Sequence, residues 1–145
     1  MLSSQGLPKG DMRSLVKNSL NLFVAGFGCC KQEIFAASGP VYDISRFGIN
    51  FTSIPEESDV LVIQGFYNKE GQSRLLEYYN RMRDPKWVIA VGKCVVDCNL
   101  LNKGFQFDKD FRETINVDFF VPGCPPRPET FMYAMLRLLE SPPDY

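Results

Sequence analysis

Runs of apolar residues recur along the chain and are separated by mixed or polar segments. The two most continuous runs are Val60-Leu61-Val62-Ile63 and Trp87-Val88-Ile89-Ala90-Val91. Runs of this length are typical of strands that are buried on both faces of a parallel sheet. Other segments are apolar or alternate between apolar and polar side chains. We therefore predict strands at residues 20–25, 49–54, 59–65, 87–91 and 117–121.

Segments with helical spacing lie between these runs. Leu75, Leu76 and Tyr79 fall on one side of a predicted helix, and Pro128 lies near the start of another. We predict helices at residues 11–19, 30–37, 71–83 and 129–139, and a turn or short helix at 42–48. Strands that alternate with helices indicate an α/β domain with a mainly parallel sheet and helices on both faces. Binding sites in such sheets gather at the carboxyl ends of the strands.

The chain of 145 residues is 45% hydrophobic, which is enough for one domain with a sizeable core. We expect a flexible N-terminal arm at residues 1–10, a single α/β domain at 11–140 and a frayed tail at 141–145. Residues 99–116 are irregular in pattern, so we expect a long surface loop there.

Charge and composition exclude several classes of function. The net charge is −1, so there is no basic field for nucleic acid. No apolar stretch has the length of a membrane span, and the N-terminus lacks the order of a signal peptide, so we expect a cytoplasmic protein. The chain has no histidine, which excludes catalysis by histidine and histidine-ligated metal sites.

Cysteines follow three of the predicted strands. Cys29 and Cys30 are adjacent and follow the first strand, Cys94 follows the strand at 87–91, and Cys124 follows the strand at 117–121. The carboxyl ends of parallel strands share one edge, so the four thiols can converge there. Four thiolates at one place are what an iron–sulfur cluster needs.

Other interpretations of these cysteines stay open at this point. Five cysteines are an odd number and two are neighbours, so a disulfide framework fits poorly. The thiols could be buried structural residues, because free cysteine is often buried. Sites of four cysteines also bind zinc, although adjacent ligands are unusual for tetrahedral zinc.

Five motifs occur in order along the chain. They are Gly28-Cys29-Cys30-x-x-Glu33, Tyr42-Asp43-x-x-Arg46-Phe47-Gly48, Ser58-Asp59-Val60-Leu61-Val62-Ile63-x-Gly65, Trp87-Val88-Ile89-Ala90-Val91-Gly92-x-Cys94 and Val121-Pro122-Gly123-Cys124-Pro125-Pro126. Together they resemble the small iron–sulfur subunit of respiratory complex I, the 20-kDa subunit, and the resemblance runs from about residue 20 to residue 139. Related families are the small subunits of nickel–iron hydrogenases and of archaeal membrane-bound sulfane-sulfur reductases.

The resemblance implies a flavodoxin-like fold and one 4Fe–4S cluster held by Cys29, Cys30, Cys94 and Cys124. It implies an electron-transfer subunit of a membrane-bound oxidoreductase that is inactive alone. Its partners would be a large catalytic-type subunit, a ferredoxin-like subunit with two 4Fe–4S clusters, and membrane subunits. It would be peripheral within a complex on the cytoplasmic side of the cell membrane, and the terminal acceptor would be quinone or sulfane sulfur (polysulfide).

The branch of the family is indicated by two features. Adjacent Cys29-Cys30 is the complex I form, whereas hydrogenase small subunits mostly have Cys-x-x-Cys. After Cys94 the family tends to be glycine-rich, but this chain has Val95-Val96-Asp97-Cys98. That departure favours a sulfur-reducing or other archaeal-type complex over quinone reduction. The alternatives are a membrane-bound nickel–iron hydrogenase small subunit and a non-redox four-cysteine metal module.

Some single residues have two interpretations. Glu33 follows Cys30 by three residues, so it could take up a proton as the cluster is reduced, or it could pair with a partner subunit. Cys98 could be a packed thiol or an alternative ligand. We also expect phenylalanines of the second half to contact partner subunits, unless they fill the core of the chain itself: Phe105, Phe107, Phe111, Phe119 and Phe120.

Overall fold

The computed structural model describes residues 19–26, 28–65, 67–96 and 115–140. Their strands form one sheet in the order β2-β1-β3-β4-β5, and each neighbouring pair is parallel. This order is that of a flavodoxin-like sheet. The strands are β1 (Leu20–Ala25), β2 (Ile49–Phe51), β3 (Val60–Gln64), β4 (Trp87–Val91) and β5 (Phe119–Val121).

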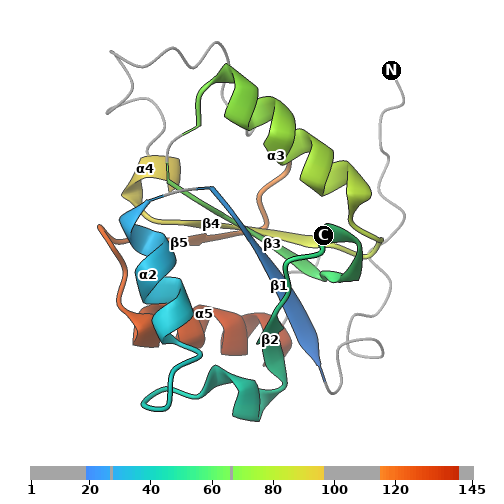
Figure 1. The fold of residues 1–145 in the computed structure, drawn as a ribbon. Helices are drawn as coiled ribbons and strands as arrows, with labels where there is room; N and C mark the ends of the chain where they lie inside the picture. Colours follow the sequence, from blue (N-terminus) through green and yellow to red (C-terminus); the bar gives the residue numbers. More distant parts are fainter. Residues whose placement is uncertain (1–18, 27, 66, 97–114, 141–145) are drawn as a thin grey trace.

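Helices cover both faces of the sheet, as Figure 1 shows. Helices α2 (Cys29–Ala36) and α5 (Pro128–Glu140) lie on one face, and α3 (Lys69–Arg81) lies on the other. The short helix α4 (Lys93–Val96) follows β4 directly. The predicted α/β fold with a parallel sheet and helices on both faces is confirmed, and so is its flavodoxin-like class.

Each face of the sheet has its own hydrophobic core. Val60 and Val62 of β3 point into the core under α2 and α5, whereas Leu61 and Ile63 point into the core under α3. All five residues of β3 are buried. Successive side chains of a strand point to opposite faces, so a strand between two helical layers must be apolar throughout.

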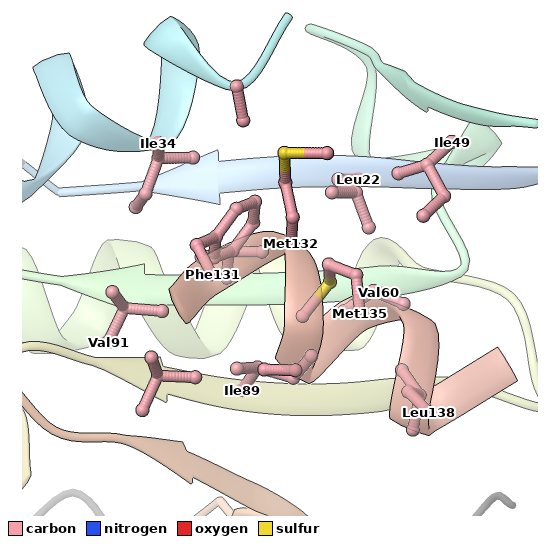
Figure 2. Close-up of a cluster of buried hydrophobic side chains, with 14 of the residues drawn as sticks. Leu22, Ile34, Ile49, Val60, Ile89, Val91, Phe131, Met132, Met135 and Leu138 are labelled. Atoms are coloured by element: carbon pink, nitrogen blue, oxygen red, sulfur yellow. The ribbon is translucent and has the colours of Figure 1, made fainter. Parts of the chain in front are cut away.

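Helix α5 covers the first core with one apolar face. Phe131, Met135 and Leu138 are buried and face the sheet on the side of Val60 and Ile89 (Figure 2). Their spacing is that of one helical face, which is why the sequence predicts this helix. Truncating Phe131 to alanine would cost about 3 to 5 kcal/mol, since the cavity could not close fully.

Several boundaries differ from the predicted ones for local reasons. Helix α3 begins at Lys69 instead of Gly71, because the Asn68 side-chain oxygen accepts a hydrogen bond from the Gly71 N–H at 2.7 Å and caps the helix. Strand β5 begins at Phe119 instead of residue 117. Just before this strand, the Asp118 N–H donates to the Val88 carbonyl. The Asp118 carboxylate in turn accepts a hydrogen bond at 2.8 Å from the Val88 N–H.

Smaller differences concern three other elements. Helix α2 begins at Cys29, one residue early, and β2 ends at Phe51 instead of residue 54. The predicted turn at 42–48 contains a 3-10 helix at Ile44–Phe47, and a second 3-10 helix covers Pro55–Glu57. Strand β4 has the predicted bounds.

Other predictions fall outside the described residues. They are the arm at 1–10, nearly all of the helix at 11–19, most of the loop at 99–116, the tail at 141–145, Cys98, and Phe105, Phe107 and Phe111. Phe119 packs against the first core, and Phe120 is 42% exposed. In the described part of the chain, no helix is long and apolar enough to cross a membrane.

Candidate functional site

The four predicted cysteines occupy three turns at one edge of the sheet. Cys29 and Cys30 begin α2 after β1, Cys94 lies in α4 after β4, and Cys124 follows β5. All of these strands run in the same direction, so the turns after them lie at the carboxyl edge. The predicted location of the cysteines, at carboxyl ends of strands, is therefore confirmed.

Backbone hydrogen bonds fix two of these turns to each other. The Gly92 N–H donates to the Val121 carbonyl at 2.9 Å, and the Lys93 N–H donates to the Gly123 carbonyl at 2.8 Å. Gly92 and Lys93 precede Cys94, and Gly123 precedes Cys124. The backbone therefore sets the relative position of Cys94 and Cys124, whatever their side chains bind.

A close approach brings the third turn into this group. Cys30 is 3% exposed and packs in the core under α2 and α5. A Cβ atom on Gly92 would lie 2.5 Å from the Cys30 Sγ, closer than two such atoms approach. Gly92 also has a φ of +92°, which residues with a side chain rarely adopt. Only glycine at position 92 lets the Cys30 thiol reach the turn after β4.

The four thiols interact electrostatically. Burial, followed by the neighbouring Cys29, Cys94 and Cys124, raises the pKa of the Cys30 thiol to about 12. Burial, followed by Cys124 and Cys29, also raises the pKa of the Cys94 thiol. Thiolates at this place would repel one another. The arrangement therefore favours a cationic group that binds and neutralises them.

The four cysteines differ in their exposure to solvent. Cys30 is buried and Cys94 is half-buried, whereas Cys29 and Cys124 are exposed. The site thus has an inner end at Cys30 and an outer end at the surface of the domain. A group held here would be shielded by the sheet on one side and open toward a neighbouring molecule on the other.

The donor set fits a four-iron cluster. It consists of four thiols from one edge of the sheet, and a 4Fe–4S cluster takes one thiolate at each iron. Tetrahedral zinc instead requires all its sulfur ligands about 2.3 Å from a single ion.

Glu33 lies on α2 and is half-buried. Its carboxylate is among the charges that raise the pKa of Tyr42, after the larger effect of a hydrogen bond to Glu129. The Tyr42 hydroxyl donates to the Glu129 carboxylate at 3.1 Å, which joins the loop after α2 to α5. Glu33 therefore has a small electrostatic effect on Tyr42, and its role in proton uptake stays a prediction.

Gln64 at the end of β3 was not singled out by the sequence. Its side chain is completely buried, and neither its amide nitrogen nor its oxygen has a hydrogen-bond partner within the described ranges. A Cβ atom on Gly28, the residue before Cys29, would lie 3.1 Å from the Gln64 Oε1. The only sequence signal is a polar residue that ends an aliphatic strand before a glycine.

Comparisons with known proteins agree with this geometry. Residues 28–138 match the family model described as NADH ubiquinone oxidoreductase, 20 Kd subunit. An NADH-quinone oxidoreductase subunit from Mycolicibacterium paratuberculosis is 37% identical over 144 residues, which cover 93% of this chain and 78% of that protein. The corresponding protein from Mycobacterium ulcerans is 36% identical with the same coverage.

A solved structure has the same fold. A chain in the structure of the membrane-bound sulfane sulfur reductase, an archaeal respiratory membrane complex, superposes with a TM-score of 0.74. It is 30% identical in sequence, and the match covers 89% of this chain and 73% of that one. The similar proteins are thus subunits of oxidoreductase complexes.

Proposed function

Since the chain belongs to the family of the 20-kDa subunit of NADH ubiquinone oxidoreductase, we propose that it transfers electrons through one 4Fe–4S cluster. The ligands in this proposal are Cys29, Cys30, Cys94 and Cys124. Family membership makes the chain a redox subunit of a complex I-like membrane oxidoreductase. The cluster and its four cysteine ligands are what we propose in addition to this family assignment.

The observation that carries the proposal is the meeting of the cysteine turns at the carboxyl edge. Gly92 leaves room for the Cys30 thiol, and the backbone bonds to Val121 and Gly123 hold the turns after β4 and β5 together. When bound, a 4Fe–4S cluster supplies one-electron transfer. The protein residues contribute four thiolates, a buried inner end at Cys30 and an outer end toward a partner.

The surroundings of the site support an assignment within a complex. In this proposal the chain receives electrons from a ferredoxin-like subunit with two 4Fe–4S clusters and shares its acceptor site with a large catalytic-type subunit. The exposed Cys29 and Cys124 and the exposed ring of Phe120 form surface that such partners would cover. The complex would include membrane subunits and place this chain peripherally, on the cytoplasmic side.

The acceptor in this proposal is quinone or sulfane sulfur. Relatives of this chain bear names of both kinds, NADH-quinone oxidoreductase and sulfane sulfur reductase. The residues after Cys94 depart from the glycine-rich form and favour sulfane sulfur. Parallel assays of the purified complex with a quinone and with polysulfide decide between them, and reduction of quinone alone would exclude the sulfur branch.

Glu33 is proposed to take up a proton when the site is reduced. Its carboxylate lies one helical turn from Cys30, and the titratable or charged groups toward α5 are Tyr42, Arg127 and Glu129. The midpoint potential should then fall as pH rises, and Glu33→Gln should flatten that dependence. Redox titration at several pH values tests this, and an unchanged slope in the variant would remove Glu33 from the mechanism.

The main proposal is tested by the metal content of the anaerobically purified complex. We expect iron and acid-labile sulfide in equal amounts at this subunit, and an electron paramagnetic resonance signal after reduction. After separation from the ferredoxin-like subunit, this subunit should be brown. A colourless subunit that carries zinc in place of iron would contradict the proposal and favour the non-redox metal module.

A further inference from the structure

Gln64 has an unusual environment for an amide. The other residues of β3 are aliphatic, yet this strand ends in a carboxamide that is 0% exposed. Both Oε1 and Nε2 are buried, and neither has a hydrogen-bond partner in the part of the chain that the structure describes. An aliphatic residue would fill the same space without removing an amide from water. A buried amide without a hydrogen bond costs free energy, so we expect the Gln64 amide to have a partner.

The position of Gln64 indicates where that partner lies. Val60 and Val62 face the core under α2 and α5, and so does Cys30. Gln64 is two residues beyond Val62 on the same strand, so its side chain lies on that face. It is therefore on the same side of the sheet as the buried thiol of Cys30.

The turns on both sides of β3 carry cysteines. Strand β3 lies between β1 and β4 in the sheet. On the β1 side, Gly28 is so close that its Cβ would be 3.1 Å from the Gln64 Oε1. On the β4 side, Gln64 is in register with Val91. The next residue, Gly92, lies close to the Cys30 Sγ. The carboxamide thus lies at the carboxyl edge, flanked by the turns that hold Cys29, Cys30 and Cys94.

We propose that the Gln64 amide donates a hydrogen bond to sulfur at the four-cysteine site and thereby raises the potential at which the site is reduced. This inference rests on the proposed function. Sulfur atoms of a cluster accept hydrogen bonds from amides, and these bonds help to set its reduction potential. The reduced site carries one more negative charge, so a donated hydrogen bond stabilises it more than the oxidised site.

The test is a redox titration of the anaerobically purified complex, followed by electron paramagnetic resonance. Gln64→Leu keeps a similar volume but cannot donate. We expect the reduced state to become about tenfold less favoured, a fall of about 59 mV for one electron. Gln64→Glu should lower the potential increasingly as pH rises, because an ionised carboxylate does not donate, whereas the protonated carboxyl still can. Gln72→Leu is the matched control, since the Gln72 Nε2 on α3 is also buried without a described partner, and it should leave the potential unchanged.

A second measurement detects the bond itself. In protein labelled with 15N at glutamine side chains, pulsed electron paramagnetic resonance of the reduced site should show a nitrogen coupling. The coupling should persist in Gln72→Leu and disappear in Gln64→Leu. If Gln64→Leu does not retain the cluster, the labelled wild-type protein and Gln64→Glu still decide the question.

The outcomes separate this inference from the proposed function. An intact cluster whose potential does not change in the Gln64 variants, or which shows no glutamine nitrogen coupling in the wild-type protein, overturns the role of Gln64 alone. A wild-type complex without a cluster overturns the proposed function and this inference with it.

Discussion

The two edges of the parallel sheet are built differently. At the amino edge, the carboxylates of Asp59 and Asp118 precede β3 and β5. Each accepts a hydrogen bond at 2.8 Å from the backbone of the neighbouring strand, from Asn21 and Val88 respectively. In both places, an aspartate side chain links the start of one strand to the neighbouring strand through a hydrogen bond.

At the carboxyl edge, two buried polar side chains lack such closure. The Gln64 carboxamide has no described partner, and the pKa of the Cys30 thiol is raised by burial and by the other thiols. Glycines with positive φ follow four of the strands there, namely Gly26, Gly65, Gly92 and Gly123. The comparison teaches that aspartates close hydrogen bonds between strands at one edge, whereas the Cys30 thiol and the Gln64 amide at the other edge leave ligands and a donor for a bound group.

The largest effect is expected at the carboxyl edge, from Gly92→Ala. The new Cβ would meet the Cys30 Sγ, and the backbone is in a left-handed conformation. We expect a loss of about 2 to 5 kcal/mol in the free energy of unfolding, together with loss of bound iron. Urea unfolding and iron analysis measure the two effects.

A control for this change lies in α3. Gly71→Ala places a Cβ 3.1 Å from the Asn68 Oδ1, a contact that a shift of a few tenths of an ångström relieves, and involves no positive φ. It should change the free energy of unfolding by less than about 1 kcal/mol and leave iron content unchanged. Normal iron content and stability in Gly92→Ala would remove the steric basis of the site.

At the amino edge, Asp118→Ala should affect stability without affecting the metal site. It leaves the buried Val88 N–H without its carboxylate acceptor, which costs about 1 to 3 kcal/mol. Asp118→Asn keeps an acceptor oxygen and should cost less. Unfolding curves and iron content are measured together. If Asp118→Ala lost iron but kept its stability, the division between the two edges would be wrong.

Tyr67 gives a smaller effect that depends on pH. Its buried hydroxyl donates to the Ala25 carbonyl at 2.9 Å, and burial raises its pKa above the ordinary value of 10.0. The folded chain therefore holds this proton more tightly than the unfolded chain. The contribution of Tyr67 to stability is fully present below pH 10 and is lost as pH rises above it.

Tyr67→Phe tests that link. At neutral pH it should lower the free energy of unfolding by about 1 kcal/mol, through loss of the hydrogen bond. Above pH 10 the variant should lose stability less steeply than the wild-type protein. Unfolding curves from pH 8 to about 11 show the difference, and parallel pH dependences in the two proteins would count against this role of Tyr67.

The sequence predicted the fold well where local pattern dominates. The aliphatic run of β4 fixed its bounds at Trp87 and Val91, because every side chain there is buried. The location of Cys94 and Cys124 also followed, since the carboxyl ends of parallel strands meet at one edge.

Tertiary contacts explain what the sequence did not predict. The short helix α4 was not predicted, and its first residue, Lys93, donates a backbone hydrogen bond to Gly123 in the turn after β5. The role of Gly92 depends on the Cys30 thiol, which is 62 positions away in the chain. Likewise, the isolation of the Gln64 amide can be seen only when α2, β3 and β4 are packed together.

The most direct test of the central claim is the cluster signal in single cysteine variants of the complex. Alanine at position 29, 30, 94 or 124 should abolish or degrade the 4Fe–4S signal in electron paramagnetic resonance, because each iron needs one thiolate. Cys98→Ala is the matched control and should retain it. A full signal in Cys30→Ala, or its loss in Cys98→Ala, would contradict the assignment of the four ligands.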